Sequence, residues 1–315
     1  MRVIITGAGG FVGQALAKKF IEVSPDAELV LADVQAPPNP TTSTKVECIG
    51  ADLTKAEVRE ALIDRSPDAV YILHGIMSSG AEANLELGLS VNFDSVRGLL
   101  DTIRVKKPGT KVVFTSSCAV FGRAAVKNVA TETDIVPMPE SSYGTQKLMV
   151  EFLLNDYSRR GFIDGRAVRL PTVFVRAGAP TAAASSFVSG IVREPVHGQE
   201  SELPVDLNIG IWLVSPRTLV HNLVHAMNVP AEKFGYFRTV LLPGYTATSG
   251  EILEALEKVA GKETRALVKE KRDENIERIV LSWPGKYDTS RAKELGFADD
   301  VGLERTIKDF IASTK

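Results

Sequence analysis

Short runs of apolar residues recur along the first 170 positions of the chain and alternate with segments of helical periodicity. The runs lie at residues 3–5, 29–32, 46–49, 70–73, 112–114 and 167–170. Each run is continuously apolar, which indicates a strand covered on both faces, as in a parallel sheet. Helices between such strands are typical of an α/β fold, so the pattern predicts a doubly wound parallel sheet of the Rossmann type.

This alternation breaks after residue 172. Pro171 follows the sixth run, and residues 177–195 are rich in Ala, Ser, Gly and Pro, a composition that cannot continue the sheet. We therefore expect the Rossmann domain at residues 1–172, with a return at 208–242 that holds a helix and its lead-in (212–227) and a final strand (237–242). A smaller C-terminal α/β substrate-binding lobe is expected at 173–207 and 243–300, and a C-terminal helix at 301–315.

One helix start in the second half can be recognised from its capping residues. Thr248 is followed three positions later by Glu251, the spacing of a capping box, and an apolar periodic segment runs from 252 to 259. We expect this helix to belong to the smaller lobe.

Composition narrows the class of protein. The 315 residues allow one full domain and a lobe, and 44% hydrophobic with 24% charged residues is ordinary for a globular protein. A net charge of −2 gives no reason to expect nucleic acid as a partner. Cys48 and Cys118 cannot form a disulfide framework. The first strand leaves no room for a signal peptide, and no apolar stretch approaches the about 20 residues of a membrane span, so we expect a cytoplasmic protein without a membrane partner.

A glycine turn links the first strand to the first helix. Gly7, Gly10 and Gly13 keep side chains away from the helix N-terminus, where backbone N–H groups can face the diphosphate of a dinucleotide. Phe11 and Val12 begin this helix and are expected to contact the same cofactor. A glycine turn by itself is often structural, so the cofactor assignment needs further residues.

Asp33 supplies the strongest of them. It ends the second strand, twenty residues after Gly13, where a carboxylate can accept hydrogen bonds from the adenosine ribose and would repel a 2′-phosphate. NAD is therefore favoured over NADP. Asp52 and Leu53 could bracket the adenine, although a helix N-cap explains Asp52 equally well. Three further cofactor contacts are expected at strand ends: His74, Gly75 and Leu170. For His74 the alternative is a packed, hydrogen-bonded side chain without a cofactor contact.

Tyr143 and Lys147 are the candidate catalytic pair. They stand four residues apart, so they project from the same face of a helix. The phenol can act as a base only if its pKa falls below the usual value of about 10, and a neighbouring ammonium group would lower it. Both side chains are also expected to contact the cofactor, Lys147 through the nicotinamide ribose.

The segment from Phe114 to Gly122 completes a resemblance. With the glycine turn and Tyr-x-x-x-Lys, its Ser116-Ser117 pair and Val120-Phe121-Gly122 resemble the extended short-chain dehydrogenase/reductase family, also called the NAD-dependent epimerase/dehydratase family. The resemblance implies a catalytic hydroxyl at Ser117 and pairing of two chains through helices of the main domain. Many members carry Tyr where this chain has Phe121, so a hydroxyl contact from that ring is not expected.

A narrower resemblance covers nearly the whole chain. Residues 142–147, 156–162, 169–173 and 182–187 are similar to the D-erythronate dehydrogenases, a branch that oxidises the C2 hydroxyl of a four-carbon sugar acid with NAD. This implies that Tyr143 removes the hydroxyl proton, that Ser117 holds the oxygen, and that a 2-oxo acid is formed. The candidates for binding the substrate are Ser78, Ser117, Tyr143, Thr172, Arg176, Ser185, Ser186 and Arg217.

Other functions stay open at this point. A nucleotide-sugar epimerase and an L-threonine 3-dehydrogenase belong to the same family, and an NAD-sensing binding protein would use the fold without catalysis. Dehydratases are disfavoured because they usually carry an Asp-Glu pair where this chain has Cys118-Ala119. His221 and His225 have the spacing of a zinc pair, but no third ligand is evident, so no metal is expected.

Overall fold

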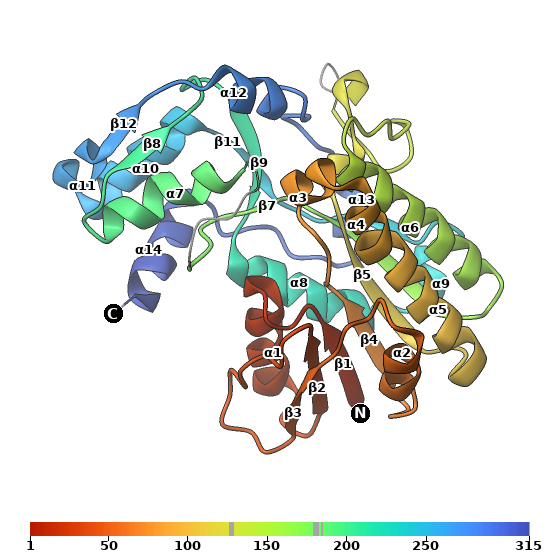
Figure 1. Ribbon diagram of the computed structural model, residues 1–315. Helices are drawn as coiled ribbons and strands as arrows, with labels where there is room; N and C mark the ends of the chain where they lie inside the picture. The colour runs from red at the N-terminus through yellow and green to blue at the C-terminus, as the bar shows by residue number, and fades with distance from the viewer. Residues whose placement is uncertain (126–128, 179–182, 184, 315) are drawn as a thin grey trace.

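The computed structural model describes residues 1–125, 129–178, 183 and 185–314 (Figure 1). Within these residues the main sheet has seven strands in the order β10-β6-β5-β4-β1-β2-β3, and every ladder in it is parallel. All six apolar runs and the expected final strand lie in it. The strands are β1 (Arg2–Thr6), β2 (Glu28–Asp33), β3 (Val46–Gly50), β4 (Ala69–Ile72), β5 (Lys111–Ser117), β6 (Asp164–Leu170) and β10 (Thr239–Leu241).

Helices cover both faces of this sheet (Figure 1). On one face, Val3 and Ile5 of β1 pack with residues of α1 (Phe11–Val23) and α8 (Pro216–Asn228). On the other, Ile4 packs with residues of α2 (Ala56–Ile63), α5 (Ser95–Lys106) and α6 (Ser142–Arg159). Because successive side chains of a strand point to opposite faces, a strand buried on both faces must be continuously apolar. The doubly wound prediction is confirmed.

Three short segments lead from β4 to α5. They are α3 (Ser78–Ala83), α4 (Leu85–Leu89) and a π-helix (Ser90–Asp94).

On the outer side of the neighbouring helix α6, Phe152 is 61% exposed. The expected pairing of two chains through main-domain helices stays a prediction.

A smaller lobe lies beyond the carboxyl ends of the main strands, at the upper left of Figure 1. Its sheets combine β7 (Thr172–Val173), β9 (Gly210–Val214) and β11 (Tyr245–Thr248), and β8 (Ser201–Leu203) with β12 (Val268–Glu270). Its helices are α7 (Ser186–Val196), α10 (Ser249–Ala260), α11 (Lys262–Ala266), α12 (Glu274–Val280) and α14 (Leu303–Ser313). Val188, Leu256 and Phe310 share one apolar cluster, so α14 packs with this lobe.

The capping box before α10 is confirmed. The Thr248 side chain accepts from the backbone N–H of Glu251, and the Glu251 carboxylate accepts from the backbone N–H of Thr248. Two orphan donors of the helix start are thereby satisfied.

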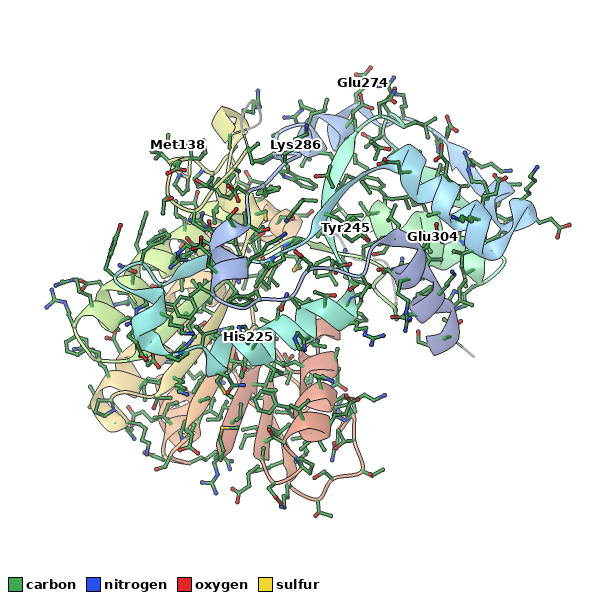
Figure 2. The ribbon with its side chains drawn as sticks, turned by 180° about the vertical axis from the view of Figure 1, so that it is seen from behind. Met138, His225, Tyr245, Glu274, Lys286 and Glu304 are labelled. Carbon is green, nitrogen blue, oxygen red and sulfur yellow. The ribbon has the colours of Figure 1, made fainter. Side chains whose placement is uncertain are left out.

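Two stretches fold differently from the expectation. The lead-in to helix α8 was expected to return to the main domain, but it forms strand β9, which pairs with β7 and β11 of the smaller lobe. Ser215 then caps α8 by accepting from the N–H of Thr218. The segment around α13 (Ser290–Glu294) was expected in the smaller lobe, but Leu295 and Phe297 pack with α1 and α8. His225 of α8, labelled in Figure 2, bonds the carbonyl of Leu295 through Nε2 at 2.9 Å. The other domain limits stay predictions.

The sheet order reverses between β1 and β4, since β2 and β3 continue on one side and β5, β6 and β10 on the other. Ligands of open α/β sheets bind at the carboxyl ends of the strands beside such a reversal. Among the described helices, none combines the length and apolar character that a bilayer crossing requires.

Candidate active site

A cavity of about 1170 Å³ lies along the carboxyl ends of the main strands and reaches the smaller lobe. The glycine turn and Asp33 line it from the main domain, and Arg176 and Trp283 line it from the side of the smaller lobe. The structure brings to this cavity all the residues expected to contact the cofactor, and their roles stay predictions: Gly7, Gly10, Phe11, Val12, Gly13, Asp33, Asp52, Leu53, His74, Gly75, Tyr143, Lys147 and Leu170.

The glycine turn has a steric cause at two positions. Gly7 has φ of +67°, and a Cβ there would lie 2.5 Å from the backbone nitrogen of His74. A Cβ at Gly13 would lie 2.6 Å from the carbonyl oxygen of Gly7. Gly10 is the N-cap of α1 and offers no side chain to cap it, so the first N–H groups of this helix are available to an anion in the cavity. The turn therefore fits a dinucleotide diphosphate.

Asp33 is held in place by the backbone around it. Its Oδ2 accepts from the N–H of Gly9 at 2.8 Å, and its Oδ1 accepts from the N–H of Val34 at 2.8 Å. Each carboxylate oxygen keeps a further lone pair, and the side chain lines the cavity. The carboxylate can therefore accept from ribose hydroxyl groups without losing its support.

Two expected cofactor contacts have local partners. Asp52 accepts from the N–H and the hydroxyl of Thr54 at 3.1 and 2.7 Å, whereas the N-cap of α2 is Lys55, so the N-cap alternative for Asp52 is wrong. His74 contacts the hydroxyls of Thr6 and Ser95 at 2.7 and 2.9 Å. Burial, assisted by the charge of Lys147, lowers the pKa of His74 to about 3. The imidazole is neutral and packed, so it is unsuited to acid/base work near neutral pH.

Helix α6 presents Tyr143 and Lys147 to the cavity. Ser141 caps the helix by accepting from the N–H of Gly144 at 3.1 Å. A Cβ at Gly144 would lie 2.2 Å from the carbonyl oxygen of Ala119, so glycine lets the helix approach the end of β5. There Ser117, at the end of β5, lines the cavity together with Tyr143. The three residues predicted to act together do lie together.

Burial is the main cause of the shifted pKa values of Tyr143 and Lys147. It raises the pKa of Tyr143 to about 12, and the hydrogen bond from Ser117 opposes the rise. It lowers the pKa of Lys147 to about 8, and the negative charge of Glu151 opposes that change. For the protein groups alone, the pKa of Tyr143 therefore lies above its usual value, because desolvation of the phenolate outweighs the contribution of Ser117. The lowering of this pKa by Lys147 during the reaction stays a prediction.

The ammonium group of Lys147 lies deep in the site. Its Nζ donates to the carbonyl oxygen of Thr115 at 2.9 Å and lies 4.7 Å from the centre of the Phe114 ring. A Cβ at Gly75 would lie 3.7 Å from this Nζ, so the glycine keeps the space before the ammonium group open. Lys147 thus reaches from helix α6 across the end of β5 toward the loop after β4.

Two buried polar groups near the pair were missed by the sequence reasoning. Asn92, in the π-helix, accepts from the N–H of Ile76 at 2.6 Å and donates to Gln146 Oε1 at 2.7 Å. Glu151 of α6 forms an ion pair with Arg169 of β6 at 2.7 Å. The signal for Glu151 was its spacing, one helical turn beyond Lys147; Asn92 could have been suspected as a polar residue in an apolar helix.

The substrate candidates divide into two groups. Ser78, Thr172, Arg176, Ser185 and Ser186 all line the cavity. Arg217 does not belong to the described lining. Its side chain is 63% exposed at the start of α8 and lies 3.7 Å from Asp309, so its expected substrate role is wrong. Arg217 was a candidate because of its position in the sequence, near segments of the smaller lobe. Helix α8 directs its side chain to the surface instead of the cavity.

Arg176 is held by helix α7. Its backbone N–H donates to Ser189 Oγ at 3.1 Å, and its carbonyl accepts from Arg193 Nη1 at 3.1 Å. Burial and the charge of Arg193 lower the pKa of Arg176. The guanidinium groups of Arg176 and Arg193 would stabilise an anion bound beside them in the cavity. Among the described residues, no group of three or more His, Cys, Asp or Glu is arranged to hold a metal ion.

Comparison with known proteins points to one family. The family model described as "NAD dependent epimerase/dehydratase family" matches residues 3–212. D-erythronate dehydrogenase of Haemophilus influenzae is 40% identical over 99% of both chains. The protein of the same name from Cupriavidus necator is 40% identical over 99% of this chain and 98% of its own. A solved structure called a nucleoside-diphosphate-sugar epimerase, from Agrobacterium tumefaciens, has a TM-score of 0.93 at 40% identity and covers 99% of this chain and 94% of its own.

The role of Asp33 can be tested by replacing it with asparagine. We expect Asp33→Asn to weaken NAD binding about tenfold, since a hydrogen bond to a charged group contributes roughly 1.5–3 kcal/mol. The preference for NAD over NADP should shrink, because the repulsion of a 2′-phosphate is removed. Calorimetric titration with both nucleotides measures this. Asp26→Asn is the control, an exposed carboxylate paired with Lys45, and unchanged NAD affinity in Asp33→Asn would contradict the assignment.

Proposed function

Because the chain belongs to the NAD dependent epimerase/dehydratase family, we propose that it oxidises the C2 hydroxyl of a small sugar acid such as D-erythronate to the 2-oxo acid. It is an NAD-dependent oxidoreductase. The relatives named D-erythronate dehydrogenase, similar along almost the whole chain, support the substrate class. The observation that carries the proposal is the meeting of Ser117, Tyr143 and Lys147 in the cavity that also holds the glycine turn.

The residues of the cavity fit NAD. The open N-terminus of α1 suits the diphosphate, and the carboxylate of Asp33 suits the adenosine ribose. When bound, NAD supplies the hydride acceptor and the positive charge of the nicotinamide ring. The preference for NAD over NADP follows from Asp33 and is part of the proposal.

Tyr143 is the proposed base. As phenolate it takes the proton of the substrate hydroxyl while the C2 hydrogen leaves as hydride, so a carbonyl group is formed. Ser117, which lines the cavity beside Tyr143, donates to the same substrate oxygen. Lys147 supplies a positive charge behind the phenol, with its Nζ 5.5 Å from the centre of the Tyr143 ring. A positive charge favours the phenolate, whereas burial raises the pKa of the phenol.

Arg176 is the proposed ligand of the substrate carboxylate. A guanidinium group can bind a carboxylate through two parallel hydrogen bonds, and Arg176 lines the cavity. Hydroxyl groups that line the same cavity can bind the remaining oxygens of a sugar acid. These groups belong to Ser78, Thr172, Ser185 and Ser186.

A nucleotide-sugar epimerase is the second candidate. One observation favours it, the name of the Agrobacterium tumefaciens structure that is 40% identical to this chain. An epimerase returns the hydride to its substrate, whereas a dehydrogenase releases NADH.

A substrate panel separates the two candidates. We expect NADH to accumulate, measured by its absorbance, when the protein and NAD are mixed with four-carbon aldonic acids. UDP-sugars should give neither NADH nor epimerised product. Epimerised UDP-sugar together with inactivity on all the aldonates would overturn the dehydrogenase proposal.

The role of Tyr143 predicts a separation of binding from turnover. Tyr143→Phe should lower kcat by about 10²–10⁴-fold, the usual contribution of a positioned acid or base, and leave NAD affinity nearly unchanged. Steady-state kinetics and NAD titration measure the two effects. Tyr157→Phe is the control, since Tyr157 lies at the far end of α6 and its hydroxyl donates to Asp101 of α5. Full turnover in Tyr143→Phe would remove this residue from the mechanism.

The carboxylate assignment predicts a change in substrate binding. Arg176→Met should raise KM for the sugar acid about 10- to 100-fold, because a charge-assisted contact of roughly 1.5–3 kcal/mol is lost. The affinity for NAD should not change. Arg217→Met, at the exposed arginine outside the cavity, is the matched control. If the control raises KM and Arg176→Met does not, the two arginines have been assigned wrongly.

A further inference from the structure

Glu151 is a buried carboxylate that the proposed reaction does not use. It lies on α6 one helical turn after Lys147 and is 2% exposed. Its Oε1 accepts from the hydroxyl of Ser116 and from Arg169 Nε at 3.0 Å, and its Oε2 accepts from Arg169 Nη2 at 2.7 Å. A buried charge is costly unless it is paired and hydrogen-bonded, and here both requirements are met.

Through Ser116, the carboxylate holds the end of the strand that carries Ser117. Thr115 is bonded to Lys147 through its carbonyl, and Ser116 is bonded to Glu151 through its hydroxyl. Side chains of helix α6 therefore form hydrogen bonds with two consecutive residues of β5. Since neighbouring side chains of a strand point to opposite sides, fixing Ser116 on one side fixes the direction of Ser117 on the other.

Through Arg169, the same carboxylate supports the wall of the cavity. The guanidinium group lies 4.8 Å from the centre of the Phe121 ring, and Phe121 lines the cavity. Arg169 is 1% exposed, and its Nη1 is buried without a hydrogen-bond partner in the described chain. The charge of Arg169 is therefore balanced by Glu151.

Glu151 also faces Lys147 along the helix. Burial lowers the pKa of Lys147 to about 8, and the carboxylate of Glu151 is the group that opposes this change. The lysine also faces the neutral imidazole of His74 and the phenol of Tyr143. Glu151 in turn faces Arg169 and Cys118, a thiol whose pKa burial raises to about 12.

We propose that Glu151 is a positioning residue for the reaction: it fixes Ser116 and Arg169 behind the catalytic groups and supplies the negative charge that stabilises protonated Lys147. The inference rests on the proposed roles of Tyr143 and Lys147. It adds a reason for a carboxylate, rather than any polar side chain, at this position.

The test is the dependence of kcat/KM on pH in Glu151→Gln. Glutamine keeps an acceptor for Ser116 and removes the charge. Loss of a nearby anion makes it easier for Lys147 to lose its proton, so the alkaline limb of the profile should move to lower pH by about one unit. Glu151→Asp keeps the charge and should restore the limb toward the wild-type position.

Asp164→Asn is the matched control. Asp164 pairs with Arg166, which is fully buried at the opposite end of the same strand β6, so this variant also leaves a buried arginine without its carboxylate. It should lower thermal stability without moving the pH profile. A Glu151→Gln profile that superimposes on that of the wild type would show a purely structural role and overturn the proposal.

Two further measurements keep the test decisive. If Glu151→Gln does not fold, Glu151→Asp carries the test: it keeps the charge but is too short to hold both Ser116 and Arg169, so kcat should fall while the limb stays near the wild-type position. An unchanged kcat, or a limb moved as far as loss of the charge predicts, counts against the proposal. Ser116→Ala removes the hydroxyl without unpairing a charge and should lower kcat about fivefold to tenfold with NAD affinity unchanged; wild-type kcat in Ser116→Ala would remove the positioning role. Tyr143→Phe is measured beside them, because an active Tyr143→Phe means that the proposed function, and not the role of Glu151, has failed.

Discussion

The docking of helix α6 against the end of strand β5 is the contact on which the site depends. Lys147 donates to the carbonyl of Thr115, and Gly144 removes the Cβ that would collide with the carbonyl of Ala119. Because all strands of a parallel sheet end at the same edge, this contact brings Tyr143 and Ser117 to the edge that carries the glycine turn. Tyr143 and Lys147 lie on α6, whereas Ser117 lies on β5. A shift of the helix along the strand would therefore move the phenol and the ammonium group away from the hydroxyl group.

Burial gives these groups their chemistry and also opposes it. It favours the neutral forms, and so it raises the pKa of Tyr143 and lowers the pKa values of Lys147 and His74. A base made from the phenol therefore requires compensating charge. In the proposed function Lys147 supplies this charge, with Glu151 behind it, and the positive ring of bound NAD would add to it. His74 stays neutral and serves the packing of the β4 end.

The two halves of the molecule divide the work in the proposed function. The Rossmann half holds the groups for the cofactor and for proton transfer, all fixed by the sheet and by α6. The smaller lobe contributes Arg176, whose backbone is tied to Ser189 and Arg193 of α7. Substrate choice therefore depends on a loop that a helix of the smaller lobe holds in place, so it can change without disturbing the catalytic groups.

The amino-acid sequence by itself determined the strands of the main sheet, the glycine turn, the capping box at Thr248 and the shared face of Tyr143 and Lys147. Each of these depends on neighbours a few residues away, through periodicity, turn geometry or helical spacing. Only the tertiary structure decided that Arg176 lines the cavity and Arg217 does not, that residues 210–214 form a strand, and that Glu151 pairs with Arg169. It also decided that burial raises the pKa of Tyr143, because burial arises from packing between segments that are distant in the chain.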